Sequence, residues 1–174
     1  MTDPNPFDLL AAALIVRPAH VMRPDRHLGL ELGDQTGILD PALTEPLAAA
    51  VRKRLPAGVA GIAVGSGVVE ILLGYLVTCE LGIPLASITN VDGRIEVGGR
   101  FPASGPVALV TTILEQEATL AEFEAACGRA SCAPAGAVAL VDRLPRPDPR
   151  VSALLRWADH EYEPSACPLC RSES

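Results

Sequence analysis

The residues best placed to do chemistry lie at 107–120, V-A-L-V-T-T-I-L-E-Q-E-A-T-L. The apolar run at 107–110 predicts a buried parallel strand, and an amphipathic helix is expected to begin near Thr119. A strand, a short turn and a helix N-terminus often bind phosphate, because backbone N–H groups there point at the anion. In this chain the turn carries the carboxylates of Glu115 and Glu117, which would repel a phosphate. The segment therefore has the strand–turn–helix order of a phosphate site, but the charges in its turn have the wrong sign for binding an anion.

A second candidate turn is glycine-rich and consists of Gly65, Ser66 and Gly67. It separates a strand predicted at 59–64 from a helix predicted at 69–80. A dinucleotide-binding loop is a weak interpretation, because Glu70 stands where the third glycine would be and no acidic residue is placed to hold a ribose. The single lysine, Lys53, lies outside any G-x-x-x-x-G-K sequence, so an ATP-type phosphate loop is excluded.

The C-terminal segment contains Cys167-Pro168-Leu169-Cys170, which has the spacing of half a zinc site. The two missing ligands would come from Cys127 and Cys132, from His160, or from the tail of a second chain. Otherwise these cysteines are reduced thiols or form a labile disulfide. The histidines show no metal-ligand spacing, and we expect surface or capping roles for all three: His20, His27 and His160.

Composition narrows the class of protein. The chain has 174 residues, 49% of them hydrophobic and 20% charged, which suits one folded domain. A net charge of −7 argues against nucleic acid and anionic membranes as partners. The N-terminus lacks the features of a signal peptide, and the apolar stretch 58–77 is interrupted by Glu70, so no membrane span is expected. Five cysteines, an odd number, favour a cytoplasmic protein with reduced thiols.

Apolar runs and turn signals predict alternating strands and helices. Helices are expected at 7–16, 41–55, 69–80 and 119–127, and strands at 59–64, 84–88, 107–110, 137–141 and 151–157. Residues 90–93 are expected to form a loop or hairpin turn, followed by a flexible excursion at 94–99. This alternation predicts right-handed βαβ units and an α/β fold with a parallel sheet.

Several segments, in this order, resemble orotate phosphoribosyltransferases. They are G-I-A-V-G-S-G-V-V at 61–69, E-L-G-I-P-L at 80–85, V-A-L-V-T-T-I-L at 107–114, V-A-L-V-D-R at 138–143 and the tail Y-E-P-S-A-C-P-L-C. The resemblance implies a type I phosphoribosyltransferase fold in a single domain, residues 1–174. A five-stranded parallel sheet flanked by helices would form the core, about 40–143. A small hood would come from about 1–39 and 144–174. It also implies a homodimer.

The family makes orotidine 5′-monophosphate for pyrimidine biosynthesis from orotate and 5-phosphoribosyl-1-pyrophosphate (PRPP), with Mg²⁺ held chiefly by PRPP. Its acidic pair, which binds the ribose hydroxyls, falls on Thr111 and Thr112. Its pyrophosphate turn falls on 65–67, and its mobile lysine loop on 89–101, which offers only Arg94 and Arg100. Its 5′-phosphate turn falls on a group with two carboxylates: Glu115, Gln116, Glu117, Ala118 and Thr119.

The residues that match on the base side of the pocket are better preserved. Asp142-Arg143 matches the family's strand-ending pair, whose arginine helps to hold orotate. Arg23 and His27 match an N-terminal Arg/Lys-Ser-Gly-x-His segment, although Pro24 and Asp25 replace its Ser-Gly. Any anionic ring ligand is expected to contact Arg143.

The pattern favours a catalytically impaired phosphoribosyltransferase-like protein. It would bind a small anionic ligand, such as a nucleotide, orotate or phosphate, or a partner subunit. The first alternative is an active transferase that uses PRPP and Mg²⁺ with orotate or a related base. The second is a protein–protein scaffold without a ligand.

Overall fold

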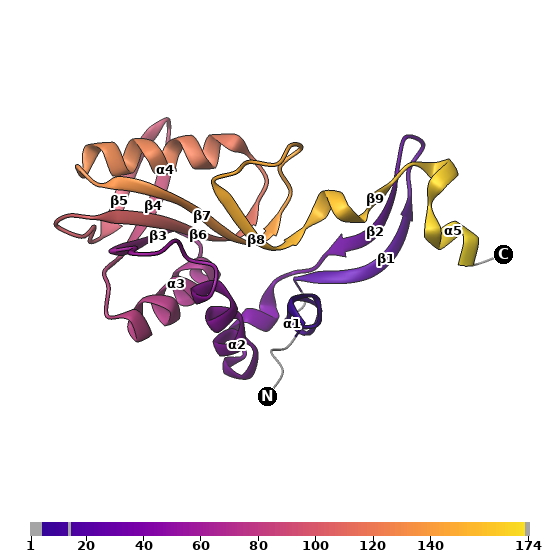
Figure 1. The fold of residues 1–174 in the computed structure, drawn as a ribbon, viewed down its shortest axis with the longest axis horizontal. Coiled ribbons are helices and arrows are strands. Elements are labelled where there is room, and N and C mark those ends of the chain that lie inside the picture. The colour runs from indigo at the N-terminus through magenta and orange to yellow at the C-terminus, as the bar shows by residue number, and fades with distance from the viewer. Residues whose placement is uncertain (1–4, 14, 173–174) are drawn as a thin grey trace.

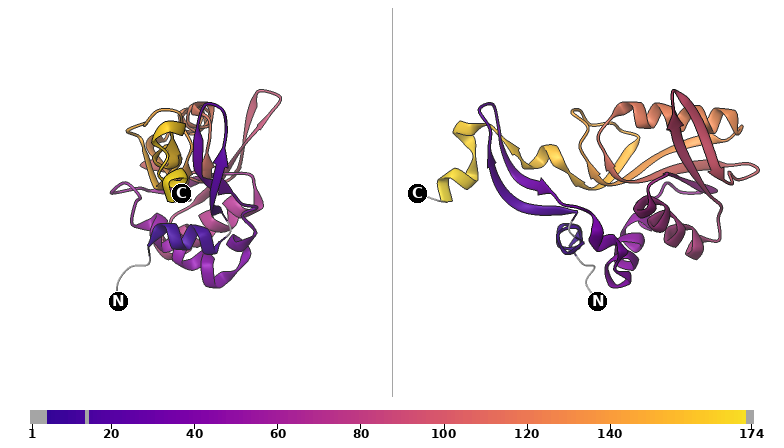
Figure 2. Two further views of the ribbon diagram at one scale, coloured as in Figure 1. Left: turned by 90° about the vertical axis from the view of Figure 1, so that its right-hand side faces the viewer. Right: turned by 180° about the vertical axis from the view of Figure 1, so that it is seen from behind.

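The chain folds into a core sheet with helices on both faces and a smaller sheet built from the two ends of the chain (Figure 1). A computed structural model describes residues 5–13 and 15–172. The N-terminal hairpin and the C-terminal tail lie side by side at one end of the molecule, as Figure 1 and the right-hand view of Figure 2 show. They form the hood that the sequence predicts.

The core sheet has six strands in the order β5-β4-β3-β6-β7-β8. The strands are β3 (Gly61–Gly65), β4 (Leu85–Val91), β5 (Arg94–Gly99), β6 (Pro106–Leu114), β7 (Ala133–Asp142) and β8 (Val151–Arg156). Five of them are parallel, as predicted, and β5 is added antiparallel to β4. Since β8 lies beyond residue 143, where the hood was expected to begin, the core sheet also includes part of the C-terminal segment.

Helices cover both faces of this sheet (Figure 1). On one face lie α2 (Pro41–Arg52) and α3 (Val68–Leu81), and on the other lies α4 (Glu117–Arg129). The Asp40 side chain caps α2 by accepting the N–H of Ala42 at 2.9 Å. Gly82 ends α3 in the left-handed conformation, with φ of 65°. The two faces bury separate apolar clusters, so the sheet is covered on both sides.

The hood is a three-stranded antiparallel sheet in the order β1-β2-β9. Its elements, with the short helices around it, are α1 (Pro6–Ala12), β1 (Val16–Met22), β2 (His27–Leu32), η1 (Thr36–Leu39), η2 (Trp157–His160), β9 (Glu161–Tyr162), η3 (Pro164–Ala166) and α5 (Pro168–Ser172). The helix predicted at 7–16 was too long. It ends at Ala12, because Val16 already pairs with Leu32 in the hairpin.

The excursion predicted to be flexible at 94–99 is instead the edge strand β5. Its register with β4 runs from Val91 opposite Arg94 to Ala86 opposite Gly99. The connecting residues Asp92 and Gly93 have φ values of 50° and 79°. Two central residues with positive φ make a two-residue hairpin turn whose twist matches that of the strands. The predicted hairpin turn is therefore confirmed, and this turn sets the register in which β5 pairs with β4.

Within the described part of the chain, every helix is too short or too polar to span a lipid bilayer.

Candidate functional site

The first candidate site is a cleft of about 330 Å³ between the carboxyl ends of β3 and β4 and the start of α4. Open α/β sheets bind their ligands at this edge. The polar part of its lining includes Gly65, Ser66, Gly67, Glu70, Asn90 and Glu122. The predicted glycine turn therefore lines this cleft, together with two carboxylates.

The Glu70 carboxylate lies directly on the glycine turn. A Cβ atom placed on Gly65 would come within 2.0 Å of Glu70 Oε2. The other carboxylate oxygen, Oε1, accepts the hydroxyl of Thr111 at 2.6 Å and the backbone N–H of Thr112 at 3.4 Å. The position that could hold a ligand's anionic group is thus filled by a side chain of the protein.

Glu70 also neutralises the N-terminus of α3. It is the third residue of that helix, a position where a carboxylate interacts favourably with the helix dipole. A helix N-terminus at this edge of the sheet would otherwise attract phosphate. The first turn of α4 also carries a carboxylate, that of Glu117, the first residue of the helix. Both helix N-termini therefore carry a carboxylate of their own.

The turn between β6 and α4 is shorter than predicted. The sequence suggested a turn at 115–118 and a helix from about Thr119, but β6 continues to Leu114 and α4 begins at Glu117. Only residues 115 and 116 connect them. Ala118 and Thr119 therefore lie in the first turn of α4, and Thr119 lines the first cleft together with the glycine turn.

Thr111 and Thr112 lie inside β6 and are almost fully buried, at 3% and 5% exposure. Besides its bond to Glu70, the Thr111 hydroxyl lies 3.3 Å from the carbonyl oxygen of Ile113. Buried hydroxyls need such partners, because an unpaired polar group away from water is costly. The two residues that match the family's acidic pair thus contact the Glu70 carboxylate, Thr111 through its hydroxyl and Thr112 through its backbone N–H.

A second cleft, of about 250 Å³, lies where the hood meets the core. Its lining includes Arg23 and Leu28 from the hood, Arg143 after β7, and Trp157 after β8. The Arg143 guanidinium carbon lies 4.8 Å from the centre of the Trp157 ring, a cation–π geometry. Arg143 also forms an ion pair with Glu115. Arg143, which was expected to bind an anionic ring, is therefore already paired with Glu115.

Asp142, the neighbour of Arg143, is buried and hydrogen-bonds to the backbone that follows β7. It is 5% exposed and accepts the backbone N–H of Leu144 at 2.9 Å. Its carboxylate lies 3.7 Å from Nε of Arg156, a buried nitrogen that makes no hydrogen bond within the described residues. These contacts fix the end of β7 and the direction in which Arg143 leaves it.

The other predicted ligand residues do not gather in one place. Arg94 and Arg100 are exposed on and beside β5, and neither lines either cleft. Arg23 lies with Arg143 in the second cleft, whereas His27 contacts the C-terminal cysteines. The set therefore divides between two clefts, a hairpin and a histidine–cysteine cluster.

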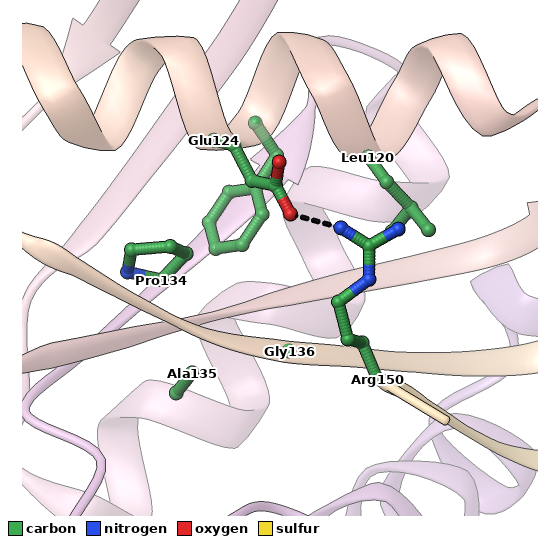
Figure 3. Close-up of a pocket in the computed structure, with 7 residues that line it drawn as sticks. Leu120, Glu124, Pro134, Ala135, Gly136 and Arg150 are labelled. Carbon is green, nitrogen blue, oxygen red and sulfur yellow. Dashed lines mark hydrogen bonds and ion pairs between the residues drawn. The ribbon is translucent and has the colours of Figure 1, made fainter. Parts of the chain in front are cut away.

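A third hollow, of about 170 Å³, lies between α4 and the amino end of β7 (Figure 3). Arg150 crosses it and pairs with Glu124 and Asp148. The hydrogen bonds from Arg150 lower the pKa of Asp148 to about 2. Because this hollow is away from the carboxyl edge of the sheet and its one arginine is paired twice, it is a weaker candidate.

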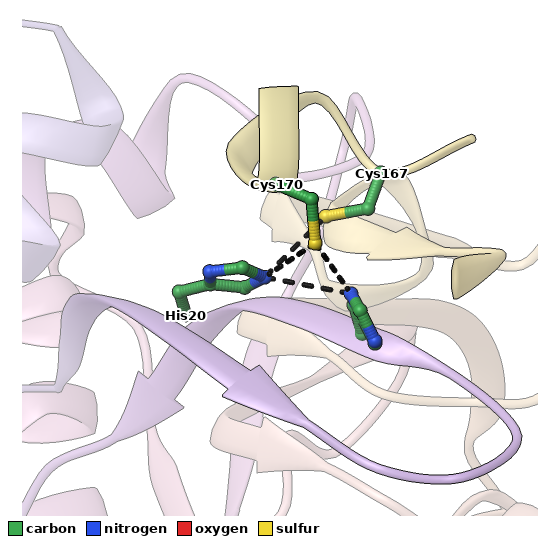
Figure 4. A group of neighbouring side chains, drawn as sticks. His20, Cys167 and Cys170 are labelled. Carbon is green, nitrogen blue, oxygen red and sulfur yellow. Dashed lines mark hydrogen bonds between the residues drawn. The ribbon is translucent and has the colours of Figure 1, made fainter. Parts of the chain in front are cut away.

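The histidine–cysteine cluster contains His20, His27, Cys167 and Cys170, and Figure 4 shows three of them converging. The sequence had suggested surface or capping roles for the histidines, which is wrong for His20 and His27. The other candidate ligands lie elsewhere. Cys127 and Cys132 are in the core beside α4, and His160 stacks on Phe7. Nothing in the sequence indicates this pairing, because the hairpin of β1 and β2 that brings His20 and His27 together was not predicted.

No family model and no curated protein matches the chain, but solved structures do. Orotate phosphoribosyltransferase from Aeropyrum pernix matches with a TM-score of 0.65 at 12% identity, over 87% of this chain and 93% of that one. Adenine phosphoribosyltransferase from Leishmania tarentolae matches with a TM-score of 0.61 at 14% identity, over 90% and 89%. UMP synthase from Leishmania donovani matches with a TM-score of 0.62 at 15% identity, over 87% of this chain but 36% of that one.

The chain therefore has the type I phosphoribosyltransferase fold. Orotate and adenine enzymes match it about equally well, and at such identities the likeness establishes the fold alone.

Proposed function

We propose that this chain is a phosphoribosyltransferase-like protein of the orotate type that has lost PRPP-dependent catalysis. The observation that carries the proposal is the position of Glu70. Its carboxylate lies on the glycine turn of the carboxyl-edge cleft and is bound by Thr111 and Thr112. In the family that the sequence resembles, this turn binds pyrophosphate and the two threonine positions carry acids that bind ribose.

The electrostatic cost supports this proposal. Two unit charges of the same sign about 4 Å apart repel by about 4 kcal/mol at an effective dielectric of about 20. Micromolar affinity corresponds to about 8 kcal/mol in total. One phosphate group next to Glu70 would thus remove much of the affinity that PRPP needs. The lining of the cleft therefore disfavours the phosphate groups of PRPP.

The second cleft supports a remaining binding role. It combines two cations, Arg23 and Arg143, with one carboxylate, Glu31, the Trp157 ring and apolar side chains such as Leu28 and Leu30. A flat ring with one carboxylate or phosphate matches that lining, because the ring can lie on apolar surface while an arginine binds the anion. We therefore propose orotate or a pyrimidine nucleotide as the ligand class.

A second copy of the chain is the proposed partner. Exposed apolar residues Val68, Ile71 and Tyr75 follow one another at helical spacing along α3. Val91 and Val97 add exposed apolar surface on the β4–β5 hairpin. An apolar stripe of this kind on a helix indicates an interface.

Calorimetry tests the proposed function. PRPP with Mg²⁺ and, separately, orotate and UMP are titrated into the parent chain. We expect no binding of PRPP at millimolar concentration and measurable binding of orotate or UMP. Micromolar PRPP affinity would overturn the proposal in favour of an active transferase. Absence of all binding would overturn the ligand role and favour a scaffold.

A further inference from the structure

The strongest unassigned feature is the convergence of four side chains from opposite ends of the chain. His20 lies on β1 and His27 on β2, while Cys167 and Cys170 belong to the C-terminal tail. Their ligand atoms all lie within 4.8 Å of one another. Cys167 and His20 are 147 positions apart in the sequence, so only the fold brings them together.

The hairpin brings the two histidine rings together. His27 pairs directly with Met22 across the hairpin. His20 lies in the bulge between Pro18 and Val21, so its position is given by its observed contact with His27 and not by the regular alternation of a strand. Their ring centres are 5.3 Å apart. The hairpin therefore presents two imidazoles towards the tail.

Four of the six distances between the ligand atoms match the edges of a metal-centred tetrahedron, and all six lie within 4.8 Å. Zn–N bonds of about 2.0–2.1 Å and Zn–S bonds of about 2.3 Å give N–N edges of about 3.4 Å and N–S edges of about 3.5 Å. His20 Nε2 lies 3.4 Å from His27 Nδ1, and 3.6 and 3.5 Å from the sulfurs of Cys167 and Cys170. Cys170 Sγ lies 3.3 Å from His27 Nδ1.

Hydrogen bonds alone do not account for this arrangement. An imidazole nitrogen has either one proton or one lone pair in the ring plane, so it makes one good hydrogen bond at a time. His20 Nε2 is within 3.6 Å of three potential partners in the cluster. A single cation at the centre satisfies all four groups at once, with the cysteines as thiolates.

We propose that His20, His27, Cys167 and Cys170 form a structural zinc site. Two nitrogens and two sulfurs in a tetrahedron favour Zn²⁺ over the harder divalent metals. With four protein ligands the site has no open position, which is typical of a structural zinc and not of a catalytic one. Burial agrees, since Cys167 is 1% and His27 9% exposed.

The metal would fasten the tail to the hairpin and so hold the hood together. The hood sheet needs such support, because β9 contributes only two residues and pairs with β2 through His27 and Leu28. Small sheets with little apolar interior commonly depend on a metal for stability. Since Arg23 of the hairpin and Trp157 line the second cleft, the zinc would also set the shape of that cleft.

Metal analysis of the purified, reduced full chain tests the proposal. After dialysis against metal-free buffer, the parent should retain about one zinc per chain. Cys170→Ser and His20→Ala should retain at least tenfold less. Cys79→Ser is the matched control, because Cys79 is an exposed free thiol on α3, outside the cluster, and it should retain as much zinc as the parent. Equal zinc in the parent and in Cys170→Ser, or none in the parent, would overturn the proposal.

Measurements on the parent alone guard against variants that fail to fold. X-ray absorption should show two sulfurs at about 2.3 Å and two nitrogens at about 2.0–2.1 Å from the zinc. Removing the metal with a chelator should lower the unfolding temperature and make the hairpin sensitive to trypsin, and adding zinc back should reverse both. Zinc coordinated by oxygen atoms, or an unfolding temperature that does not change when the chelator is added, would contradict a structural site.

Discussion

Replacing Glu70 with glutamine should give the carboxyl-edge cleft an affinity for pyrophosphate that the parent lacks. The change removes one negative charge next to Gly65 while keeping the size of the side chain. The amide oxygen can still accept the hydroxyl of Thr111, which the carboxylate accepts at 2.6 Å. We therefore expect the free energy of unfolding to fall by about 1 kcal/mol or less.

The gain in binding follows from the charge that is removed. At about 4 Å and an effective dielectric of about 20, Glu70 repels each unit of phosphate charge by about 4 kcal/mol. The side chain is only half-buried, so water screens part of this energy. A net gain of about 1.4–4 kcal/mol remains, which is about a ten- to thousandfold tighter Kd.

The assay is calorimetric titration of pyrophosphate and of PRPP, each with Mg²⁺, into the parent, Glu70→Gln and Glu80→Gln. Glu80 is the matched control, because it lies near the far end of α3 and pairs with Arg52. Only Glu70→Gln should bind more tightly. If Glu70→Gln and Glu80→Gln bind pyrophosphate and PRPP with equal affinity, the Glu70 carboxylate does not exclude these anions from the cleft.

Three further predictions test other parts of the account. Arg143→Ala should weaken the binding of orotate or UMP by roughly ten- to hundredfold, since a charged hydrogen bond contributes about 1.5–3 kcal/mol. Arg146 is an exposed neighbour, and Arg146→Ala should leave this binding unchanged. Equal affinities of the parent and Arg143→Ala would place the ligand elsewhere. Light scattering at high micromolar concentration should show a dimer that Tyr75→Glu converts to monomers, whereas a monomeric parent would refute the interface on α3. The pKa of Asp148 is lowered from 3.8 to about 2, so its contribution to stability is complete above about pH 4 and disappears as the pH falls towards 2. Asp148→Asn should therefore unfold with a weaker pH dependence over that range, as acid titration followed by circular dichroism would show.

The sequence predicts the core of the fold because its signals are local. The apolar runs that become β3 and β6 are hydrophobic on both faces, as strands buried in a parallel sheet must be. Asp40-Pro41 marks the start of α2 and Gly82 the end of α3, and both signals act through their own backbone neighbourhood. Composition and order were enough to indicate the fold class.

Edge strands and the hood were harder to predict. β5 is mostly exposed and ends in two glycines, so its alternation of polar and apolar residues extends over only four positions, Arg94 to Val97. Its pairing depends on the main chain and on the Asp92-Gly93 turn. In β1, Pro18 and a bulge before Val21 interrupt the strand pattern. The helix was wrongly extended to residue 16 because residues 9–16 form one apolar run in the sequence.

The most informative side-chain contacts could not be read from spacing. Glu70 and Thr111 are 41 positions apart, and nothing in either segment indicates that one caps the other. The histidines and the C-terminal cysteines are separated still further. The sequence showed two carboxylates in the segment that resembles a phosphate turn, and the fold shows that a third, Glu70, lies in the cleft.

The central claim is that the fold persists here without PRPP chemistry. The most direct test is a turnover assay in which the parent chain receives orotate, PRPP and Mg²⁺ at saturating concentrations, with formation of orotidine 5′-monophosphate followed by absorbance. We predict no product above the rate of a control without protein. Turnover at an ordinary enzymatic rate, about 1 per second or faster, would contradict the claim.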